Sequence, residues 1–511
     1  EMELILILLC FTSMVATAKL PFLPPVYQTR EEFVKSAKEP IKEINVQEIS
    51  QALGSQTVEA LTDSKDVLRR LSEQTPVYTT PDLSIRDKEA AMSKRAENTV
   101  LDRPSIETIN RPYSQFLYGG DIMLSPKHRA ILEKVVADQG SKSIIIRNKR
   151  GAPVITNDKW PKGTPISYSF NSSIDAATRT LIRAAAAKIS ANTCIDYQEN
   201  GPGANYLHFI KGTGCWSYLG MEGGKQEISI GANCDTIGII SHEMTHALSI
   251  DHTQNRKDRD QYVSLNIGAI NSSTLHNFNK LTDSENDNFG VTYDYGSDMH
   301  YGAFSFSING QAVLVTSDPN WGNTMGQRKY LTFSDYKLIN LLYNCSSSCP
   351  KQMVCQNGGY PHPRDCNKCV CNDFYTGTNC ETPRLTMNIP SIGRTMYSQE
   401  YDPPLYASGS NNNWDLFGKD SVKIIKAPEG KRIKVSFDKL FVAYGQLPCY
   451  SGCPFNGVEI VEGDNFGSMG KIFCCSKDEG YSFISKTNVI GYKAYASPGM
   501  PFDATVTYTV V

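Results

Sequence analysis

Four residues with the chemistry of a metal site fall within eleven positions of this 511-residue chain: His242, Glu243, His246 and His252, in the pattern H-E-x-x-H-x-x-S-x-x-H. Residues four apart share one face of a helix, so His242 and His246 can bind the same metal ion, with Glu243 beside them to act on a water. His252 reaches that ion only if the helix ends near Ser249 and the chain turns back. Three neutral imidazoles with one open position form the ligand set of a catalytic zinc site, because a fourth protein ligand closes a structural one.

The motif alone is a weak signal, because H-E-x-x-H also occurs by chance. Two further features support it: the third histidine, and residues 297–301 with the sequence S-D-M-H-Y. Together they resemble the metzincin zinc peptidases, which predicts one catalytic Zn²⁺ in this chain.

Length, charge and the N-terminal residues indicate a secreted protein of several domains. The length allows three or four domains, and a net charge of −2 without a Lys/Arg-rich run gives no indication of nucleic-acid binding. An apolar stretch at 4–11 before A-T-A at 16–18 predicts a signal peptide over residues 1–18. The chain begins with Glu1 and an acidic region, which we interpret as a fragmentary or misassigned start. A buried core helix is the alternative, since neither this stretch nor any other is long and apolar enough to span a bilayer.

Cysteine usage also indicates an oxidising, extracellular compartment. Cys10 lies in the predicted signal peptide, and the other cysteines begin at Cys194 and concentrate toward the C-terminus, as disulfides would. Asn171 and Asn271 open N-S-S sequons, so we expect glycosylation there once the chain is secreted. Asn344 opens a third, weaker sequon.

The elements that position the histidines follow a long leader. Residues 19–150 are charged, cysteine-free and rich in helix-forming residues, with no dense apolar pattern before residue 144. The leader ends in R-N-K-R at 147–150, which predicts cleavage by a proprotein convertase between Arg150 and Gly151; a solvated charge patch is the alternative. We therefore expect residues 19–150 to be a propeptide.

From Trp160 the pattern is that of a compact mixed α+β domain. Alternation predicts strands at 166–170, 206–210 and 227–230. Helical spacing predicts a helix through Leu181, Ala185 and Ile189, with Asp175 near its start. After the histidine helix, a regular pattern returns only at 336–342.

Two further regions follow the mixed domain. Six cysteines between 349 and 380 indicate a small module that needs disulfides, because it cannot build a core of its own. After Pro383, short β-type runs at 422–425, 433–437, 458–461 and 504–510 predict a β-sandwich of about 120 residues.

These motifs resemble the astacin family of metzincins over about residues 110 to 345. R-K-D-R-D-Q-Y at 256–262 follows the helix signature as in the family, and 293–301 resembles its Met-turn. The resemblance implies that Met299 packs beneath the metal and that Tyr301 is a distant, switchable zinc ligand, with an ordinary core tyrosine as the alternative. It also implies that 214–218 and 226–231 form the edge along which the substrate lies.

The resemblance assigns roles in peptide hydrolysis and in latency. Glu243 is the general base toward the attacking water and then gives the proton to the leaving amine, while Tyr301 donates a hydrogen bond to the developing oxyanion. Y-G-G-D at 118–121 resembles the family's F-x-G-D switch, in which Asp121 would occupy the zinc position that water later takes. The cysteine-free leader independently excludes a thiolate latch; a simple turn at 119–121 is the alternative.

Two positions depart from the family pattern. Ser249 replaces a glycine at the turn that ends the helix, where a left-handed backbone would cost a non-glycine residue roughly 1–2 kcal/mol. Thr253 replaces the glutamate that in the family anchors the new N-terminus, so that ion pair with Gly151 cannot form. Neither change affects a zinc ligand or the base.

The resemblance further implies a domain order like that of nematode members of the family. The parts would be a signal peptide (1–18), a propeptide (19–150), a metallopeptidase domain (151–346), an epidermal-growth-factor-like (EGF-like) module (347–382) and a CUB-like β-sandwich (383–511). By resemblance to the family, the disulfides would be Cys194–Cys345, Cys215–Cys234, Cys349–Cys366, Cys355–Cys369 and Cys371–Cys380. The last three of these bridges are one of several connectivities that six cysteines allow.

The chain is therefore expected to be a secreted zinc metalloendopeptidase made as a zymogen, which acts on extracellular proteins and binds the extracellular matrix through its EGF-like and CUB-like modules. An inactive homologue that acts only by binding is one alternative, but it would have lost a zinc histidine or Glu243, and all are present. Another metzincin clan is a second alternative, but it would carry a cysteine latch or lack Tyr301.

Overall fold

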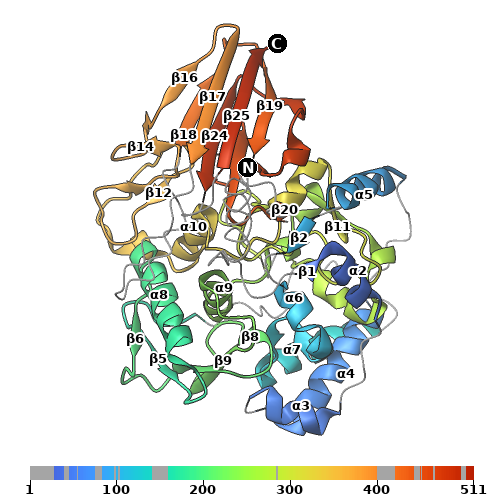
Figure 1. Ribbon diagram of the computed structural model, residues 1–511. Coiled ribbons are helices and arrows are strands. Elements are labelled where there is room, and N and C mark those ends of the chain that lie inside the picture. The colour runs from blue at the N-terminus through green and yellow to red at the C-terminus, as the bar shows by residue number, and fades with distance from the viewer. Residues whose placement is uncertain are drawn as a thin grey trace, which may run out of the picture.

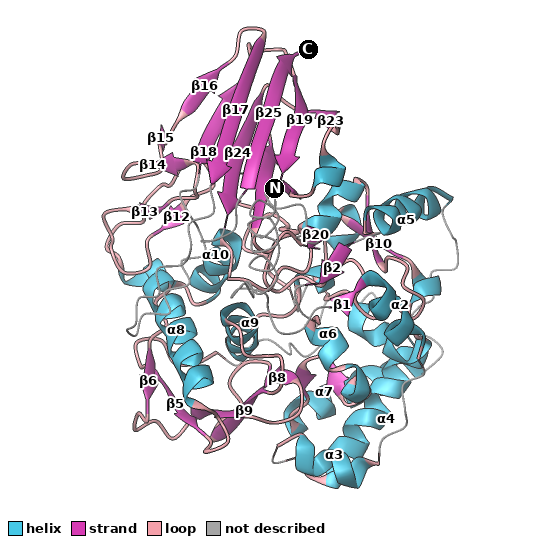
Figure 2. Cartoon of the chain, viewed as in Figure 1, coloured by secondary structure: helices cyan, strands magenta, loops and turns pink. Residues whose placement is uncertain are grey.

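The computed structural model describes residues 28–39, 45–54, 56–74, 83–96, 99–101, 104–140, 159–282, 286–399, 421–441, 449–450, 452–463, 466–496 and 502–511. The predicted signal peptide and the processing positions Arg150 and Gly151 lie outside these ranges. The described chain forms a helical leader, a mixed α/β body around the central helix α9, and a β-sandwich at one end (Figures 1 and 2). No helix in these ranges has the length and hydropathy needed to cross a membrane.

The leader is helical, as its composition indicates. Its first two strands are β1 (Gln28–Thr29) and β2 (Thr99–Leu101), and its α-helices are α2 (Arg30–Lys38), α3 (Val46–Ala52), α4 (Val58–Gln74), α5 (Leu83–Arg95), α6 (Ile106–Ile109) and α7 (Pro126–Gly140). The prediction that the leader has no dense apolar pattern is wrong for α4, where Val67, Leu68 and Leu71 are buried in one cluster with Leu132 and Val136 of α7. The leader therefore has a packed core, and it lies along one side of the mixed body (Figure 1).

A seven-stranded sheet joins the leader to the mixed body, in the order β3-β4-β8-β9-β7-β5-β6. Its strands are β3 (Leu117–Tyr118), β4 (Ile122–Met123), β5 (Ile166–Phe170), β6 (Tyr197–Glu199), β7 (Tyr206–Ile210), β8 (Cys215–Tyr218) and β9 (Lys225–Ile230). Strands β9, β7, β5 and β6 are parallel neighbours, whereas β8 is antiparallel to β9. This confirms the three predicted strands, and the sheet contains both parallel and antiparallel neighbours. The leader strand β4 pairs in parallel with β8, so the leader occupies the edge of the sheet.

Two long helices pack beside this sheet, α8 (Ala176–Asn192) and α9 (Ile237–Ala247). Asp175 caps α8 by accepting a hydrogen bond of 2.8 Å from Thr178 N, and Ala185 and Ile189 are buried, which confirms the predicted helix. Helix α9 is buried along its whole length. The histidine helix is therefore the core helix of the mixed body.

The rest of the mixed body is rich in loops and 3₁₀ turns, as predicted. It contains η2 (Thr253–Asn255), η3 (Arg259–Gln261), β10 (Val263–Leu265), η4 (Ile267–Ala269), η5 (Ser272–Phe278), β11 (Leu314–Thr316), η6 (Pro319–Asn323) and α10 (Phe333–Leu342). Helix α10 begins with a capping box, in which the side chains of Thr332 and Asp335 each bind the backbone N–H of the other residue.

The C-terminal part begins with short strand pairs and ends in a β-sandwich. After η7 (Cys345–Ser348), the pairs are β12 (Tyr360–Pro361) with β13 (Cys369–Val370) and β14 (Tyr375–Thr376) with β15 (Thr382–Pro383). One sheet of the sandwich has the order β16-β18-β24-β21-β22 and the other β17-β25-β19-β23. Their bounds are β16 (Thr386–Asn388), β17 (Ile392–Gln399), β18 (Ser421–Lys426), β19 (Ile433–Phe441), β21 (Asn456–Glu462), β22 (Lys471–Phe473), β23 (Ser482–Ile484), β24 (Val489–Ala496) and β25 (Phe502–Val510). The predicted β-sandwich is confirmed.

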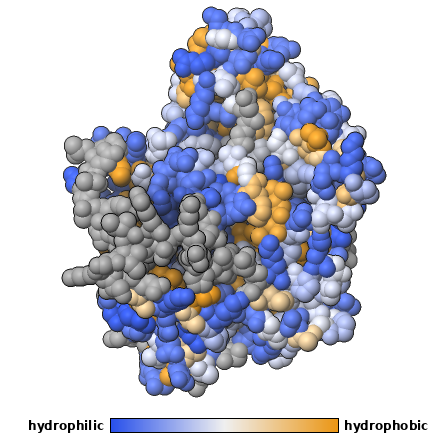
Figure 3. All heavy atoms as spheres, turned by 180° about the vertical axis from the view of Figure 1, so that it is seen from behind, coloured by the Kyte–Doolittle hydropathy of each residue, from blue (hydrophilic) through white to orange (hydrophobic). Residues whose placement is uncertain are grey.

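The sandwich is not a separate lobe. Its strand β20 (Cys449–Tyr450) pairs in parallel with β2 of the leader, and its 3₁₀ turn η8 (Ser476–Asp478) lies near the end of α5. Seen from behind, the molecular surface is mostly hydrophilic, with hydrophobic side chains in separate patches (Figure 3).

Candidate metal centre

The turn after α9 brings the three histidines together. The helix ends at Ala247, as predicted, and Ser249 adopts a left-handed backbone with a φ of +71°. The N–H of Ser249 donates to the carbonyl of His246 at 2.9 Å, which closes the turn. His252 therefore returns to the face of α9 that carries His242 and His246, and all three rings are buried.

The hydrogen bonds of two rings define which nitrogen faces the centre. Nδ1 of His242 lies 2.8 Å from the carbonyl oxygen of Asp298, and Nδ1 of His246 lies 2.8 Å from that of Ile250. A carbonyl oxygen can only accept, so each Nδ1 carries the proton and each Nε2 presents a lone pair. These two Nε2 atoms lie 3.1 Å apart.

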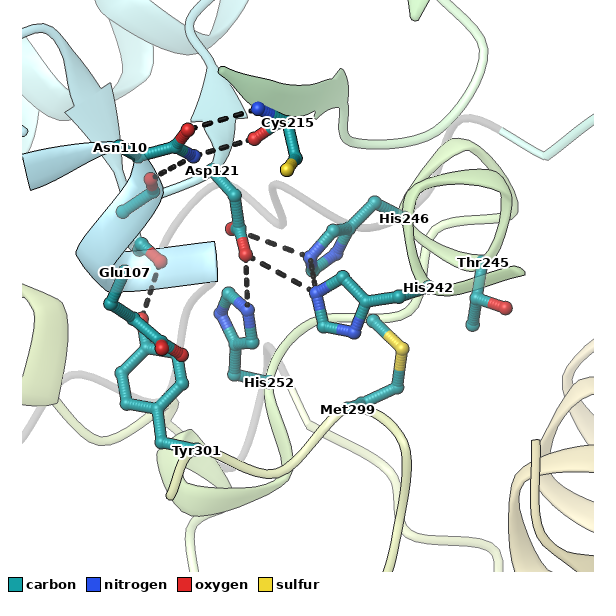
Figure 4. Close-up of polar contacts among 12 residues, drawn as sticks. Glu107, Asn110, Asp121, Cys215, His242, Thr245, His246, His252, Met299 and Tyr301 are labelled. Carbon is teal, nitrogen blue, oxygen red and sulfur yellow. Dashed lines mark hydrogen bonds and ion pairs between the residues drawn. The ribbon is translucent and has the colours of Figure 1, made fainter. Parts of the chain in front are cut away.

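A carboxylate of the leader completes the cluster. Asp121 Oδ2 lies 3.2 Å from Nε2 of His242 and 3.2 Å from Nε2 of His252, and Oδ1 lies 3.4 Å from Nε2 of His246 (Figure 4). Burial alone would raise the pKa of Asp121, but its interactions with the histidines hold that pKa well below its usual value. The carboxyl group is therefore ionised and available as a ligand.

The donors of this cluster fit a zinc ion. One ligand atom from each of Asp121, His242, His246 and His252 lies within 4.8 Å of all the others, and this is the only such group of three or more among the described residues. Lone pairs that face each other at 3.1 Å repel unless a cation lies between them. Ligands about 2.0–2.2 Å from a tetrahedral Zn²⁺ are roughly 3.3–3.6 Å apart, close to the separations seen here. The sequence-predicted histidines and Asp121 are thus brought together, and Asp121 would be the fourth ligand.

Glu243 is a buried carboxylate without a hydrogen-bond partner. Its side chain is fully buried, and within the described structure neither oxygen finds a donor. Burial and the nearby charge of Asp121 raise the pKa of Glu243 well above its usual value. An orphaned carboxyl group beside a ligand cluster is costly for stability, and it suits a base that acts on a water bound in place of Asp121.

Two residues of the Met-turn lie at the same centre. Met299 is buried beneath the rings of His242 and His246 (Figure 4). The Tyr301 ring centre lies 4.6 Å from that of His252, and the Tyr301 hydroxyl donates to the carbonyl oxygen of Gly119 in the leader. The tyrosine is therefore near the ligands, and the leader holds its hydroxyl.

Two asparagines that the sequence did not single out hold the leader turn in place. Asn110 Nδ2 donates to the carbonyl oxygens of Gly120 and Cys215, and its Oδ1 accepts from Cys215 N at 2.9 Å. Asn277 Oδ1 accepts from Gly119 N at 2.9 Å. No local motif marks either residue, because each acts only through contacts distant in sequence.

The glycines of the leader turn allow its close approach. A Cβ atom at Gly119 would lie 3.0 Å from Nδ1 of His252, and one at Gly120 would lie 2.6 Å from Cζ of Phe306. Both glycines have positive φ, +60° and +79°. A side chain at either glycine would push Asp121 away from the histidines. Gly119 and Gly120 therefore allow the close approach of Asp121 in addition to forming a turn.

Thr253 takes part in a series of side-chain hydrogen bonds, where the family pattern has a glutamate that forms an ion pair. Its hydroxyl donates to Ser297 Oγ at 2.8 Å, and Ser297 Oγ donates to Asp335 Oδ1 at 2.6 Å. A cavity of about 300 Å³ lies beside these hydrogen bonds, with Thr253, Asp294 and Asp335 in its wall. Buried carboxylates are thus available next to the position where the family carries its glutamate.

The remaining predicted positions lie away from the centre. The structure forms disulfides between Cys194 and Cys345, Cys215 and Cys234, Cys349 and Cys366, Cys355 and Cys369, Cys371 and Cys380, and Cys453 and Cys474. The side chains of Asn171 and Asn271 are half-buried, and each Oδ1 accepts a hydrogen bond from the N–H two residues on.

The fold and the centre define a zinc metalloprotease of the metzincin type, and comparison with known proteins identifies the family. Residues 154–344 match the family model "Astacin", which describes a family of peptidases. The chain is 32% identical over 399 residues to zinc metalloproteinase nas-28 of Caenorhabditis elegans, which covers 76% of this chain and 78% of that protein. It is 32% identical over 457 residues to nas-36 of the same species, with 84% and 71% covered. The chain belongs to the astacin family, and it is a zinc-dependent hydrolase.

A solved structure also matches. High choriolytic enzyme 1, a hatching-enzyme zinc protease from Oryzias latipes, is 35% identical, with a TM-score of 0.35, and the match covers 37% of this chain and 96% of that one.

Proposed function

We propose that this chain is a secreted endopeptidase made as a zymogen, in which residues 19–150 block the zinc centre until cleavage between Arg150 and Gly151. The single observation that carries the proposal is the position of Asp121, whose carboxylate lies within 3.4 Å of one nitrogen of each histidine. A charged leader residue at that position excludes the water that hydrolysis needs. Release of the leader would open this position.

Once the leader has left, residues of this chain have distinct roles. Bound Zn²⁺ would lower the pKa of a water and polarise the scissile carbonyl. Glu243 takes the proton of the attacking water and returns it to the leaving amine. Tyr301, no longer bound to Gly119, donates its hydroxyl proton in a hydrogen bond to the developing oxyanion.

The edge of the sheet would bind the substrate backbone. The leader strand β4 pairs with β8, and Ser217 N donates to the carbonyl oxygen of Asp121 at 3.0 Å. When β4 leaves, the backbone groups of β8 are free to pair with an extended peptide, as in other cases of strand addition. This supports a protease whose substrate lies extended along β8 next to the histidines.

The other modules and the compartment complete the proposal. The disulfide-rich segment 347–382 is proposed to be an EGF-like module and 383–511 a CUB-like domain, both suited to bind extracellular matrix or protein substrates. The disulfides are consistent with an oxidising compartment, and a proprotein convertase would cleave at R-N-K-R. Asn171 and Asn271 would be glycosylated there.

A peptide-library experiment tests this function. The convertase-processed chain is compared with its Glu243→Ala form, with and without a zinc chelator. We expect cleavage that the chelator abolishes and that the variant lacks. Equal absence of cleavage in both proteins would favour an inactive homologue that acts by binding.

A further inference from the structure

A guanidinium group of the leader fills a pocket on the C-terminal sandwich. Arg95 ends α5, and its Nη2 donates a hydrogen bond of 2.8 Å to Asp478 Oδ1. Its guanidinium carbon lies 5.9 Å from the ring centre of Phe473 and 5.7 Å from that of Tyr481, close enough for attraction between a cation and an aromatic face. Lys477 Nζ donates to the carbonyl oxygen of Arg95, so the end of the helix is held as well.

The arginine pocket, formed by Phe473, Lys477, Asp478 and Tyr481, is part of the sandwich itself. The rings of Phe473 and Tyr481 stack with their centres 5.7 Å apart. The Asp478 side chain is only 2% exposed, and in the described part of the chain its Oδ2 has no hydrogen-bond partner. Arg95 therefore uses one oxygen of a buried carboxylate and leaves the other unpaired. A guanidinium that entered more deeply could bind both oxygens in a bidentate pair.

The pocket lies where the leader, the mixed body and the sandwich meet. Asn320 Nδ2, in η6 of the mixed body, donates a hydrogen bond of 2.6 Å to the Tyr481 hydroxyl. Helix α5 packs beside η6 and reaches the base of the sandwich (Figure 1). A ligand in the pocket would thus be bound to the sandwich and held next to the catalytic body.

The cation in this pocket belongs to the one segment that the enzyme would lose. An ion pair with a buried carboxylate leaves an uncompensated buried charge when its cationic partner departs. A purely structural pair would join residues that stay together, whereas this pair joins Asp478 to the leader. Processing would therefore expose a buried carboxylate and two aromatic rings that are already shaped around a guanidinium.

We propose that the arginine pocket is an exosite of the processed enzyme, which binds an arginine side chain of a protein substrate, and that Arg95 occupies it as a substrate mimic in the intact chain. The inference rests on the proposed function, because the pocket opens only when the leader leaves. Lysine fits less well, since its ammonium cannot donate in a planar fork or stack on the rings. The leader thus blocks the enzyme at two places, with Asp121 at the histidines and Arg95 on the sandwich.

Binding of a labelled peptide tests the exosite without any measurement of activity. The probe is a fluorescent peptide of residues 83–96, the protein is the processed Glu243→Gln chain, and the readout is fluorescence anisotropy. We expect Arg95→Gln in the peptide to weaken binding at least roughly tenfold. Asp478→Asn in the protein should cause the same loss, and both changes together no further loss. Glu429→Gln, at an exposed position of the same sandwich, is the matched control and should bind normally.

Equal binding of the two peptides would overturn the proposal; this result is expected if Lys477 turns to pair with Asp478 after the leader leaves. The peptide change leaves the protein untouched, so a folding defect of Asp478→Asn does not decide the outcome. Failure of the proposed function would be seen in separate measurements. The chain would remain uncleaved on a gel, or the processed chain that retains Glu243 would cleave no peptide. For an uncleaved chain, the leader is removed at a different protease site placed at residues 147–150, and the same loss with the altered peptide is expected.

Discussion

The backbone N–H of Met469 donates a hydrogen bond of 3.1 Å to Asp294 Oδ1, which joins the C-terminal sandwich to the Met-turn. The same carboxyl group accepts from Gly296 N at 2.9 Å and from Ser334 Oγ at 2.6 Å. A Cβ atom at Gly296 would lie 2.5 Å from the Met469 sulfur, so the sandwich packs directly on this turn. Asp294 therefore connects the Met-turn, the start of α10 and the sandwich.

Asp294→Asn should change how stability depends on pH. Burial raises the pKa of Asp294 to about 7, so between about pH 4 and 7 the unfolded chain loses a proton that the folded chain retains. The free energy of unfolding is therefore not reduced by this group below about pH 4. As the pH rises from about 4 to about 7, it falls by up to roughly 4 kcal/mol. Asparagine has the same shape and no proton to lose. We expect the difference in Tm between the Asp294→Asn variant and the unmodified chain to increase from about pH 4 to 7 and then to level off.

Thermal unfolding across this pH range, followed by circular dichroism, is the measurement. Asp87→Asn, at an exposed position of α5, is the matched control. A Tm difference for Asp294→Asn that stays constant with pH would refute the linkage.

Ser249→Gly should stabilise the chain. Ser249 has a φ of +71°, a conformation that costs a residue with a Cβ atom roughly 1–2 kcal/mol. Glycine removes that strain, but it also raises the conformational entropy of the unfolded chain, which offsets part of the gain. We expect the free energy of unfolding, measured with a denaturant, to increase by up to about 1 kcal/mol. Ser249→Ala retains the Cβ atom and should give no gain. A loss of stability with glycine would mean that the serine hydroxyl contributes more than the backbone strain costs.

Asp121→Asn should weaken zinc binding in the intact chain but not in the processed chain. The amide has the shape of the carboxylate but not its charge, so the ligand set would lose its single anion. We expect zinc to pass to a coloured chelator at least roughly tenfold faster from the intact variant than from the unmodified intact chain. The processed chain no longer contains residue 121, and its release rate serves as the internal control. Identical release from both intact proteins would count against Asp121 as a ligand.

Glu243→Gln should remove peptidase activity and leave metal content unchanged. Glutamine cannot accept the proton of the attacking water, which should lower kcat by roughly 10²–10⁴-fold. The three histidines are untouched, so we expect one zinc per processed chain by elemental analysis. Glu429→Gln should behave as the unmodified enzyme in both assays. Loss of zinc together with activity would instead indicate that Glu243 supports the ligands.

The chemistry of the centre could be predicted from the sequence because it depends on short-range spacing. His242 and His246 lie one helical turn apart, and the spacing of His252 requires the helix to end near Ser249. The strands at 166–170 and 206–210 could be predicted for the same reason, since alternation and helical period are local properties.

Only the tertiary structure decided which residues hold the leader on the enzyme. Asn110 binds Cys215 across 105 positions, and Arg95 reaches Asp478 across 383. No local pattern encodes such pairs, because they arise when separate elements pack and bury polar groups that must then find partners. The sequence by itself determined what the centre can do, and the packing of the leader and the sandwich decided what covers it.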